Sequence, residues 1–252
     1  MSKKNVKILI KNLAFPVIGI VGFLFVWGVA SALYGVPAIL PSPLSALRGA
    51  GRLLIEGVFW QAFVGTLLRS LAAFLISFGL ALILALLCAV FDAKQIIAAP
   101  IAIVRSVPTI VVISLFLLWT DSASATPVLI AILVIFPTVY SSFTAGIEKT
   151  PLAVVESARV YGANRLELVR FVYAPSLASN IAENIASGFS LTLKLIVSAE
   201  FMVWTRNSLG AFIHNYRTVR FMADRVMAAT LFVAVFCIIF EYSVRIFIKS
   251  EK

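Results

Sequence analysis

Long apolar stretches separated by short polar segments set the pattern of this chain. A helix that crosses a membrane needs about 20 mostly apolar residues, because each residue advances about 1.5 Å through a hydrocarbon core of about 30 Å. Six stretches meet this requirement. The pattern therefore predicts an all-α integral membrane protein with six transmembrane helices, which form a single domain over residues 1–252. The predicted spans are approximately residues 15–33, 70–91, 96–119, 126–147, 178–204 and 226–247.

The basic residues between the apolar stretches predict how the spans are oriented. Short cytoplasmic loops carry more Lys and Arg than loops on the other side of the membrane. If the N-terminus is cytoplasmic, twelve basic residues lie in inner segments and six in outer segments. An even number of spans returns the chain to its starting side, so we expect both termini in the cytoplasm. The basic start and Ala30-Ser31-Ala32 also resemble a signal peptide, but this apolar stretch has the length of a retained anchor.

Composition agrees with a membrane location and argues against several other classes. Of the 252 residues, 62% are apolar and 13% are charged, and the mean hydropathy is +1.05. A soluble domain of this length could not bury so much apolar surface. The net charge of +10 does not indicate nucleic-acid binding, because the basic residues are dispersed and form no patch. Cys88 and Cys237 lie within apolar runs, which predicts free buried thiols and neither a disulfide nor a metal site.

The connection between the first two spans, residues 34–60, predicts a short helix at the outer surface. Pro37, Pro41 and Pro43 favour an extended entry into this segment. Ser42 is a suitable N-cap, and Pro43 suits the first turn of the helix that follows.

The longest cytoplasmic connection, residues 148–176, predicts a compact elbow of two short helices. Thr150 can cap the first helix, and Pro151 suits its first turn. Gly162 permits the positive φ that ends this helix, and Asn164 can cap the next one. From these residues alone, an amphipathic elbow that lies on the inner membrane surface is an equal alternative to a docking element.

A spaced set of residues in this elbow resembles a known signature. A glutamate is followed by a small pair, a glycine at plus six, a branched apolar residue at plus sixteen and a proline at plus nineteen. This spacing resembles the cytoplasmic signature of the permeases of binding-protein-dependent ABC importers. In that family the segment forms a coupling helix that docks in a groove of the ATPase. Ser157 replaces the first alanine of the family's pair, and the corresponding residues are Glu156, Ser157, Ala158, Gly162, Val172 and Pro175.

Further short motifs resemble the nitrate, sulfonate and taurine branch of these permeases. Each motif is weak alone, but their order and spacing together are specific, and they extend over roughly residues 15–250. The motifs are Leu40-Pro41-Ser42-Pro43, Leu68-Arg69-Ser70, Arg105-Ser106-Val107-Pro108, Leu118-Trp119, Ala199-Glu200 and Ser208-Leu209-Gly210.

The resemblance implies a multi-pass permease subunit in the bacterial inner membrane that is not itself an enzyme. It would form the path for a small polar, anionic solute such as nitrate, a sulfonate or taurine. Its expected partners are a second permease copy, two cytoplasmic ATPase subunits, an extracytoplasmic substrate-binding protein and the lipid bilayer. The chain contains no P-loop pattern, so we expect ATP to be bound by the partner ATPase, and we expect no cofactor in this chain.

Three alternatives stay open beside this interpretation. A permease of the same family could import a vitamin or cofactor precursor. A self-sufficient secondary transporter would show paired halves with interrupted helices, and no such duplication is visible. A membrane enzyme would need acids, bases or nucleophiles gathered at one depth, and the only histidine, His214, lies in an outer loop among too few ligands for a metal.

Polar residues recur on one face of the fifth span. Glu183, Ser187, Ser190, Lys194 and Ser198 fall within an arc of roughly 80° on a regular helix. A charge near the middle of the bilayer is costly, so this arc should face protein or a water-filled path. Alternatively, Lys194 pairs with a carboxylate on a neighbouring helix, and Glu200 pairs with Arg105 or Arg69. The candidate residues of the translocation path are Ser187, Ser190, Lys194, Ser198, Arg105 and Glu200.

The predicted topology can be tested by cysteine labelling of intact cells. Single cysteines at Arg52, Ser124 and His214 should react with a membrane-impermeant thiol reagent, because these positions are expected outside. Cysteines at Lys94 and Gly162 should react only after the cells are permeabilised. Strong labelling at position 162 in intact cells would contradict the predicted orientation.

Overall fold

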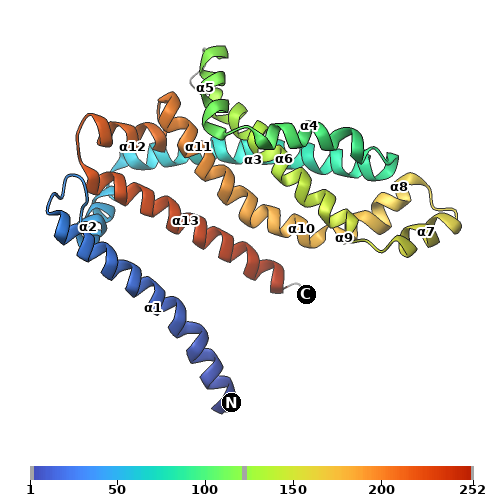
Figure 1. The fold of residues 1–252 in the computed structure, drawn as a ribbon, viewed down its shortest axis with the longest axis horizontal. Helices are drawn as coiled ribbons and strands as arrows, with labels where there is room; N and C mark the ends of the chain where they lie inside the picture. The colour runs from blue at the N-terminus through green and yellow to red at the C-terminus, as the bar shows by residue number, and fades with distance from the viewer. Residues whose placement is uncertain (1–2, 121–123, 251–252) are drawn as a thin grey trace. The chain divides into compact units, whose positions relative to one another are not determined.

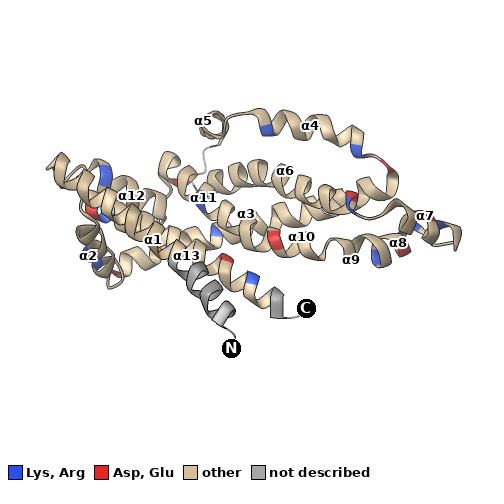
Figure 2. Ribbon diagram, turned by 60° about the horizontal axis from the view of Figure 1, so that its bottom comes forward, with Lys and Arg blue, Asp and Glu red and all other residues tan. Residues whose placement is uncertain are grey.

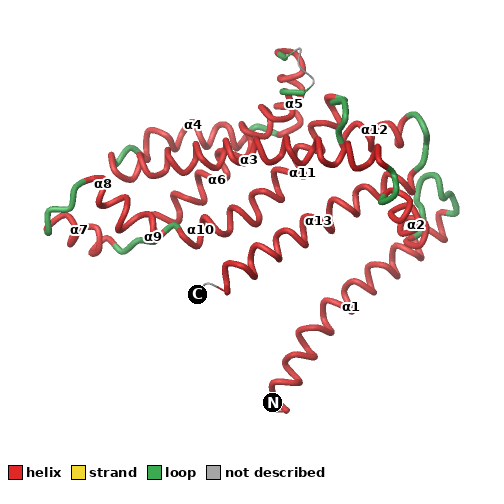
Figure 3. The backbone as a smooth tube through the Cα atoms, turned by 180° about the vertical axis from the view of Figure 1, so that it is seen from behind, coloured by secondary structure: helices red, strands yellow, loops and turns green. Residues whose placement is uncertain are grey.

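The computed structural model describes residues 3–120 and 124–250, and within these ranges it contains helices and loops but no strand (Figure 3). The chain forms two compact units. One consists of Met1–Glu56 and Asn215–Phe232, and the other of Gly57–His214 and Val233–Lys252. The expectation of an all-α chain is therefore confirmed. The ends of the predicted single domain, residues 1–2 and 251–252, and residues 121–123 lie outside the described residues.

The first unit contains α1 (Lys3–Tyr34), α2 (Pro43–Leu53), the end of α12 (Leu209–Thr218) and the start of α13 (Ala223–Ser250) (Figure 1). The helix of the first predicted span thus begins earlier than expected, because the basic N-terminal segment continues it. None of the apolar window Val17–Tyr34 is buried. This surface is suited to lipid or to another chain.

The entry to α2 has the predicted cap. The Ser42 hydroxyl accepts a hydrogen bond from the Ser45 N–H at 3.2 Å, and Pro43 occupies the first turn. The preceding extended segment is held by α1, because the Trp27 indole N–H donates to the Pro41 carbonyl at 3.0 Å. Near the end of α2, Glu56 and Arg225 form an ion pair at 2.5 Å, which fixes the segment after α2 to the start of α13.

The second unit is built on α3 (Gly57–Phe91), α6 (Thr126–Glu148) and α11 (Phe189–Val203), which pack against one another (Figure 1). Lipid is as apolar as leucine, so helices in a membrane associate chiefly through close packing and hydrogen bonds. Ala81 and Ala85 of α3 are fully buried. Their small side chains leave room for Phe143 and Val139 of α6, which belong to the same buried cluster. Figure 2 shows that the middle of α6 carries no charged residue, as expected for a membrane span.

The third predicted span is broken in two. α4 (Lys94–Ser106) and α5 (Thr109–Trp119) meet at an angle of 91°. Pro108 has no N–H to give to the helix, and it forces the preceding Val107 into an extended conformation with ψ 127°. The expected kink at Pro108 is therefore a full break. Among the described residues, five helices are long and apolar enough to cross a membrane, or six if this bent pair counts as one span.

The helical segments around the fifth predicted span are irregular. The chain passes through α9 (Ala174–Ser176), α10 (Ala178–Glu183) and a π-helical turn η2 (Asn184–Gly188) before α11. π-helical turns are rare and occur frequently at functional sites. Because a π turn holds more residues than an α turn, it changes the direction of side chains after it relative to a regular 100° repeat. Ser187 lies in this turn.

Candidate functional site

The elbow consists of α7 (Leu152–Val160), α8 (Arg165–Leu168) and the π turn η1 (Val169–Tyr173). Gly162 ends α7 with φ +84°, and its N–H donates to the Arg159 carbonyl at 2.9 Å. Asn164 caps α8 through a reciprocal pair of bonds. Its side chain accepts from the Glu167 N–H at 2.9 Å, while its own N–H donates to the Glu167 carboxylate at 2.7 Å. Gly162 therefore ends α7 and Asn164 caps α8, as the sequence predicts.

The predicted cap at the start of the first elbow helix is wrong. Pro151 takes the N-cap position with ψ 129°, and no side chain caps the helix. Because Pro151 is extended, the helix starts one residue later than expected. The Thr150 hydroxyl consequently has no hydrogen-bond partner in the described part of the chain.

The inner face of the elbow packs on the helical bundle. Val155, Leu168 and Val172 form a buried cluster that also contacts Leu86 and Val90 near the end of α3. Val172, together with the half-buried Ala158 that packs against this cluster, is thus the part of the sequence signature that fixes the elbow to the end of α3. A further link is the Arg165 guanidinium, which lies 4.6 Å from the centre of the Phe91 ring.

The outer face of the elbow exposes large apolar side chains that the sequence signature does not include. Val160 is 85% exposed and Tyr161 is 91% exposed, and Leu166 is also exposed. Glu156 lies exposed on the helix that carries Val160. Of the remaining signature residues, Ser157, Gly162 and Pro175 are exposed and Ala158 is half-buried. Figure 2 shows that α7 and α8 carry both basic and acidic residues. Such a surface is suited to a partner with an apolar groove and a charged rim.

Two of the predicted path residues face the last helix. The Ser187 hydroxyl donates to the Glu241 carboxylate at 2.9 Å, and Arg245 donates to both groups. The buried Ser190 hydroxyl bonds to the Ala186 carbonyl at 3.1 Å and lies 3.4 Å from the Cys237 carbonyl. Ser187 and Ser190 therefore connect α11 and its preceding turn to α13.

Lys194 and Ser198 are exposed. No carboxylate lies within ion-pair distance of Lys194 in residues 3–120 and 124–250, and Glu241 is paired with Arg245. Lys194 nevertheless interacts electrostatically with Glu241 and Cys237 of the neighbouring α13, so the alternative of a carboxylate partner on another helix stays open. The Ser198 hydroxyl donates to the Lys194 carbonyl at 2.9 Å.

Glu200 lies in a buried polar network near the C-terminal end of α11. Its carboxylate is 0% exposed and accepts from Thr66 and Arg69, each at 2.7 Å, and from the Gly210 N–H at 3.3 Å. Arg69 also donates to the Asn207 carbonyl at 3.0 Å. Of the two expected partners for Glu200, the structure pairs it with Arg69. The network joins α3 to the loop between α11 and α12.

Three short motifs of the sequence meet in this network. Arg69, Glu200 and Gly210 each come from a different one, separated by up to about 140 residues in the chain. A Cβ at Gly210 would overlap the backbone of Phe201 and the side chain of Glu200, so only glycine fits. The three motifs therefore build one buried network. The position of each motif in the sequence does not by itself reveal this contact.

Arg105 lies apart from Glu200, in a small groove between α4 and α6. Its guanidinium donates to the Ser141 hydroxyl at 3.0 Å. The groove has a volume of about 180 Å³ and is also lined by Lys94 and Thr144. Lys94 forms an ion pair with Glu148 at the end of α6.

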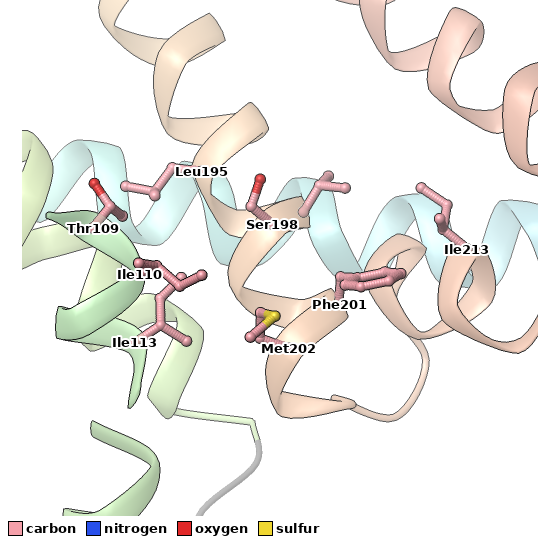
Figure 4. Close-up of a pocket in the computed structure, with 9 residues that line it drawn as sticks. Thr109, Ile110, Ile113, Leu195, Ser198, Phe201, Met202 and Ile213 are labelled. Carbon is pink, nitrogen blue, oxygen red and sulfur yellow. The ribbon is translucent and has the colours of Figure 1, made fainter. Parts of the chain in front are cut away.

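A larger cavity lies beside the break between α4 and α5 (Figure 4). It has a volume of about 570 Å³, and Ser198 is the one predicted path residue on its wall. α5 supplies one wall and α11 the opposite wall. Pro108 offers no side-chain cap to α5, whose first N–H groups have no intrahelical partner. The lining residues are Thr109, Ile110, Ile113, Leu195, Val197, Ser198, Phe201, Met202 and Ile213.

Residues 81–251 match the family model described as the binding-protein-dependent transport system inner membrane component. The chain belongs to this family. Members are membrane permeases of ABC transporters, in which ATP hydrolysis occurs in a partner subunit. The resemblance seen in the elbow signature is therefore confirmed, together with the import type of the transporter.

Relatives of this permease include two from the predicted branch. The taurine transport system permease protein TauC of Escherichia coli is 24% identical, covering 87% of this chain and 81% of its own length. The putative aliphatic sulfonates transport permease protein SsuC of Bacillus subtilis is 25% identical, with 76% and 69% covered. The riboflavin transport system permease protein RibX of Chloroflexus aurantiacus is 29% identical, with 76% and 72% covered.

Solved structures share the fold of this permease. A bacterial ABC transporter involved in the import of the acidic polysaccharide alginate has a chain with a TM-score of 0.68 and 17% identity, and 98% of each chain is covered. An amino acid ABC transporter crystallised with histidines gives a TM-score of 0.65 and 19% identity, covering 77% of this chain and 94% of that one. At these identities the likeness concerns the fold.

No group of three or more His, Cys, Asp or Glu residues that could hold a metal ion occurs within residues 3–120 and 124–250. The His214 ring instead packs against aromatic rings, with its centroid 5.1 Å from that of Phe201 and 5.2 Å from that of Trp204. It belongs to the same part of the second unit as the Glu200 network.

The buried network predicts different effects for two carboxylates of this permease. Glu200→Ala should lower the free energy of unfolding by about 3 kcal/mol or more, because it leaves the half-buried Arg69 without its charged partner. Glu241→Ala should cost less than about 1 kcal/mol, since its pair with Arg245 is partly exposed. Thermal unfolding of the purified variants in one detergent measures the difference. Equal losses of stability would contradict a central role for the Glu200 network.

Proposed function

We propose that this permease works as a pair of copies that together form the path for a small polar, anionic solute. Two ATPase subunits would bind inside and a substrate-binding protein outside. The elbow carries this proposal, because it is a preformed docking element in a chain without a nucleotide site of its own. Its exposed apolar tip requires a partner surface, and its buried face connects that partner to the membrane helices.

The orientation of the proposed transporter follows from the basic residues. With both termini in the cytoplasm of a bacterial cell, the elbow lies at the inner face of the inner membrane. α2 and the loop between α11 and α12 then lie outside, where a binding protein would dock. The Glu200 network stabilises that outer loop.

The elbow is suited to transmit a movement of the ATPase to the membrane helices. Val160 and Tyr161 would enter a groove of the ATPase, while Val155 and Val172 fix the elbow to the end of α3. A displacement of the ATPase would therefore move the inner end of α3 rather than bend a slack loop. ATP binding and hydrolysis would change access to the path through this contact.

The proposed path runs along the exposed residues of α11. Lys194 provides a positive charge that forms no ion pair within the described residues, although it lies near Glu241, and Ser198 provides a hydroxyl. The start of α5 adds partial positive charge from unpaired N–H groups, and starts of interrupted helices bind anionic groups in other transporters. A second copy would shield this face from lipid, because an exposed ammonium group at this depth is costly.

A second candidate solute class is a vitamin or cofactor precursor. The match to the riboflavin permease RibX supports it, as the matches to TauC and SsuC support a sulfonate. Either solute class would be transported by the same permease and coupled to ATP hydrolysis through the same elbow.

Changes in the elbow should uncouple transport from ATP hydrolysis. Gly162→Pro removes the N–H that bonds to Arg159 and excludes the observed φ, and Glu156→Lys reverses a charge beside the apolar tip. We expect both variants to insert normally but to lose most ATP-dependent uptake in proteoliposomes with the partner ATPase. Normal uptake per assembled complex in both variants would refute the coupling role.

The charge at Lys194 should affect transport more than assembly. Lys194→Gln should reduce uptake of an anionic solute, and Lys194→Glu should reduce it further by repulsion. Leu191→Gln, at an exposed position of the same helix, is the matched control and should have little effect. Uptake per assembled complex separates an effect on transport from an effect on assembly. Unchanged uptake per complex in both Lys194 variants would show that this residue does not line the path.

A further inference from the structure

Within the first unit, α2 is held firmly against the start of α13 (Figure 1). A Cβ at Gly49 would come within 3.0 Å of the Asp224 carbonyl oxygen, so the two helices approach closely. The ion pair between Glu56 and Arg225 fixes the segment that follows α2. The side chains that α2 turns away from α13 are therefore held in fixed directions.

The exposed side of α2 carries an apolar arc beside a basic arc. Leu44, Leu47 and Leu54 fall within about 80° around the helix, and all three are exposed. Arg48 and Arg52 lie next to this arc, about 40° apart, and both are exposed. Neither arginine forms an ion pair with a carboxylate in residues 3–120 and 124–250.

This distribution is typical of a helix that lies in the plane of a membrane interface. With 11 residues, α2 is about 17 Å long and too short to cross the hydrocarbon core. Its buried face, formed by Ala46, Gly49 and Leu53, points to the protein, on roughly the opposite side from the apolar arc. The apolar arc is thus free to enter lipid while α2 stays attached to α13.

A groove between α1 and α13 indicates the depth at which α2 lies. It has a volume of about 480 Å³, and Trp27 and Leu40 are on its wall. The polar groups of these walls are already used, because Thr230 donates to the Val226 carbonyl at 2.9 Å and Trp27 donates to Pro41. The groove therefore suits an acyl chain better than a polar solute. α2 begins three residues after Leu40, at the edge of this apolar layer.

A phospholipid layer is the occupant that matches both arcs of α2. It presents acyl chains below phosphates, so one surface contacts the leucines and the arginines together. The apolar arc also continues the surface of α1, whose window Val17–Tyr34 has no buried residue. A second copy of this chain would cover the leucines and exclude lipid, which makes lipid contact the deciding observation.

We propose that α2 is an interfacial anchor of this permease. Leu44, Leu47 and Leu54 lie among the acyl chains of the leaflet at the end of α1, and Arg48 and Arg52 bind the phosphates of anionic phospholipids. This surface lies outside the proposed path and serves either solute class. Only its assignment to the outer leaflet rests on the proposed orientation.

Quenching by brominated lipids tests the apolar contact, measured on the permease assembled with its ATPase in nanodiscs. Leu47→Cys is labelled with bimane, and background labelling is low because the native Cys88 and Cys237 are buried. Phosphatidylcholine brominated in its acyl chains should quench this label strongly. The same label at Tyr161, which is 91% exposed on the elbow, should not be quenched.

Competition between headgroups tests the phosphate contact. In mixed nanodiscs, brominated phosphatidylglycerol should be preferred at position 47 over equally abundant brominated phosphatidylcholine, by up to about fivefold for each arginine. Arg48→Gln combined with Arg52→Gln should abolish this preference but leave the quenching by acyl chains. Arg206→Gln, at an exposed position of the other unit, is the matched control and should retain it. Salt at about 1 M should weaken the preference, because the Debye length falls to about 3 Å.

Three outcomes would overturn the inference. No quenching at position 47 by either brominated lipid would show that protein covers α2. Equal quenching by the two lipids with both arginines present would show that the phosphates are not recognised. Loss of the preference when inorganic phosphate replaces chloride at constant ionic strength would assign the arginines to a free anion. ATP-dependent uptake is measured in parallel, and normal uptake without quenching refutes only this inference and not the proposed function.

Discussion

The buried carboxylate of Glu200 constrains how α3, α11 and α12 meet in the second unit. A charge taken out of water is stable only when charged and polar partners replace its hydration. Thr66, Arg69 and Gly210 provide that replacement, and they come from α3 and from the start of α12. The three elements must therefore meet in one arrangement. The position of α11, and with it every polar residue that α11 presents, depends on this arrangement.

The break at Pro108 is the second constraint, and it produces the cavity. A regular helix would satisfy its own N–H groups and pack along α6. Because Pro108 removes one donor and extends Val107, α5 leaves the line of α4 by 91°. The start of α5 then faces α11 across open space with N–H groups that are not used within the helix. Irregular backbone at membrane depth is tolerated where it is covered by protein or lines a cavity.

Local structure was largely predictable from the sequence, because its causes are local. Ser42 and Pro43 start α2, Gly162 ends α7, and Asn164 starts α8, each through contacts within a few residues. The apolar lengths located the spans, although helix ends extended beyond them. The cap at Thr150 failed because the adjacent proline was extended and took its place.

The partners of the site residues were not predictable in the same way. Arg69 and Glu200 are 131 residues apart, and the choice of Arg69 over Arg105 depends on how α3 and α11 pack. The π turn at Asn184–Gly188 also has no simple sequence signal, yet it directs Ser187 toward Glu241. The exposed tip at Val160 and Tyr161 was missed because the family signature marks other positions of the elbow.

The central claim is that the elbow transmits the work of a partner ATPase to this permease. Disulfide cross-linking tests it most directly, with Tyr161→Cys in the permease and single cysteines along the apolar groove of the co-expressed ATPase. Tyr161 is 91% exposed, so the thiol is accessible before docking. The account predicts a permease–ATPase adduct whose yield changes between ATP-bound and nucleotide-free states, and no adduct from a cysteine at Arg52. An adduct from position 52 with none from position 161 would contradict the account.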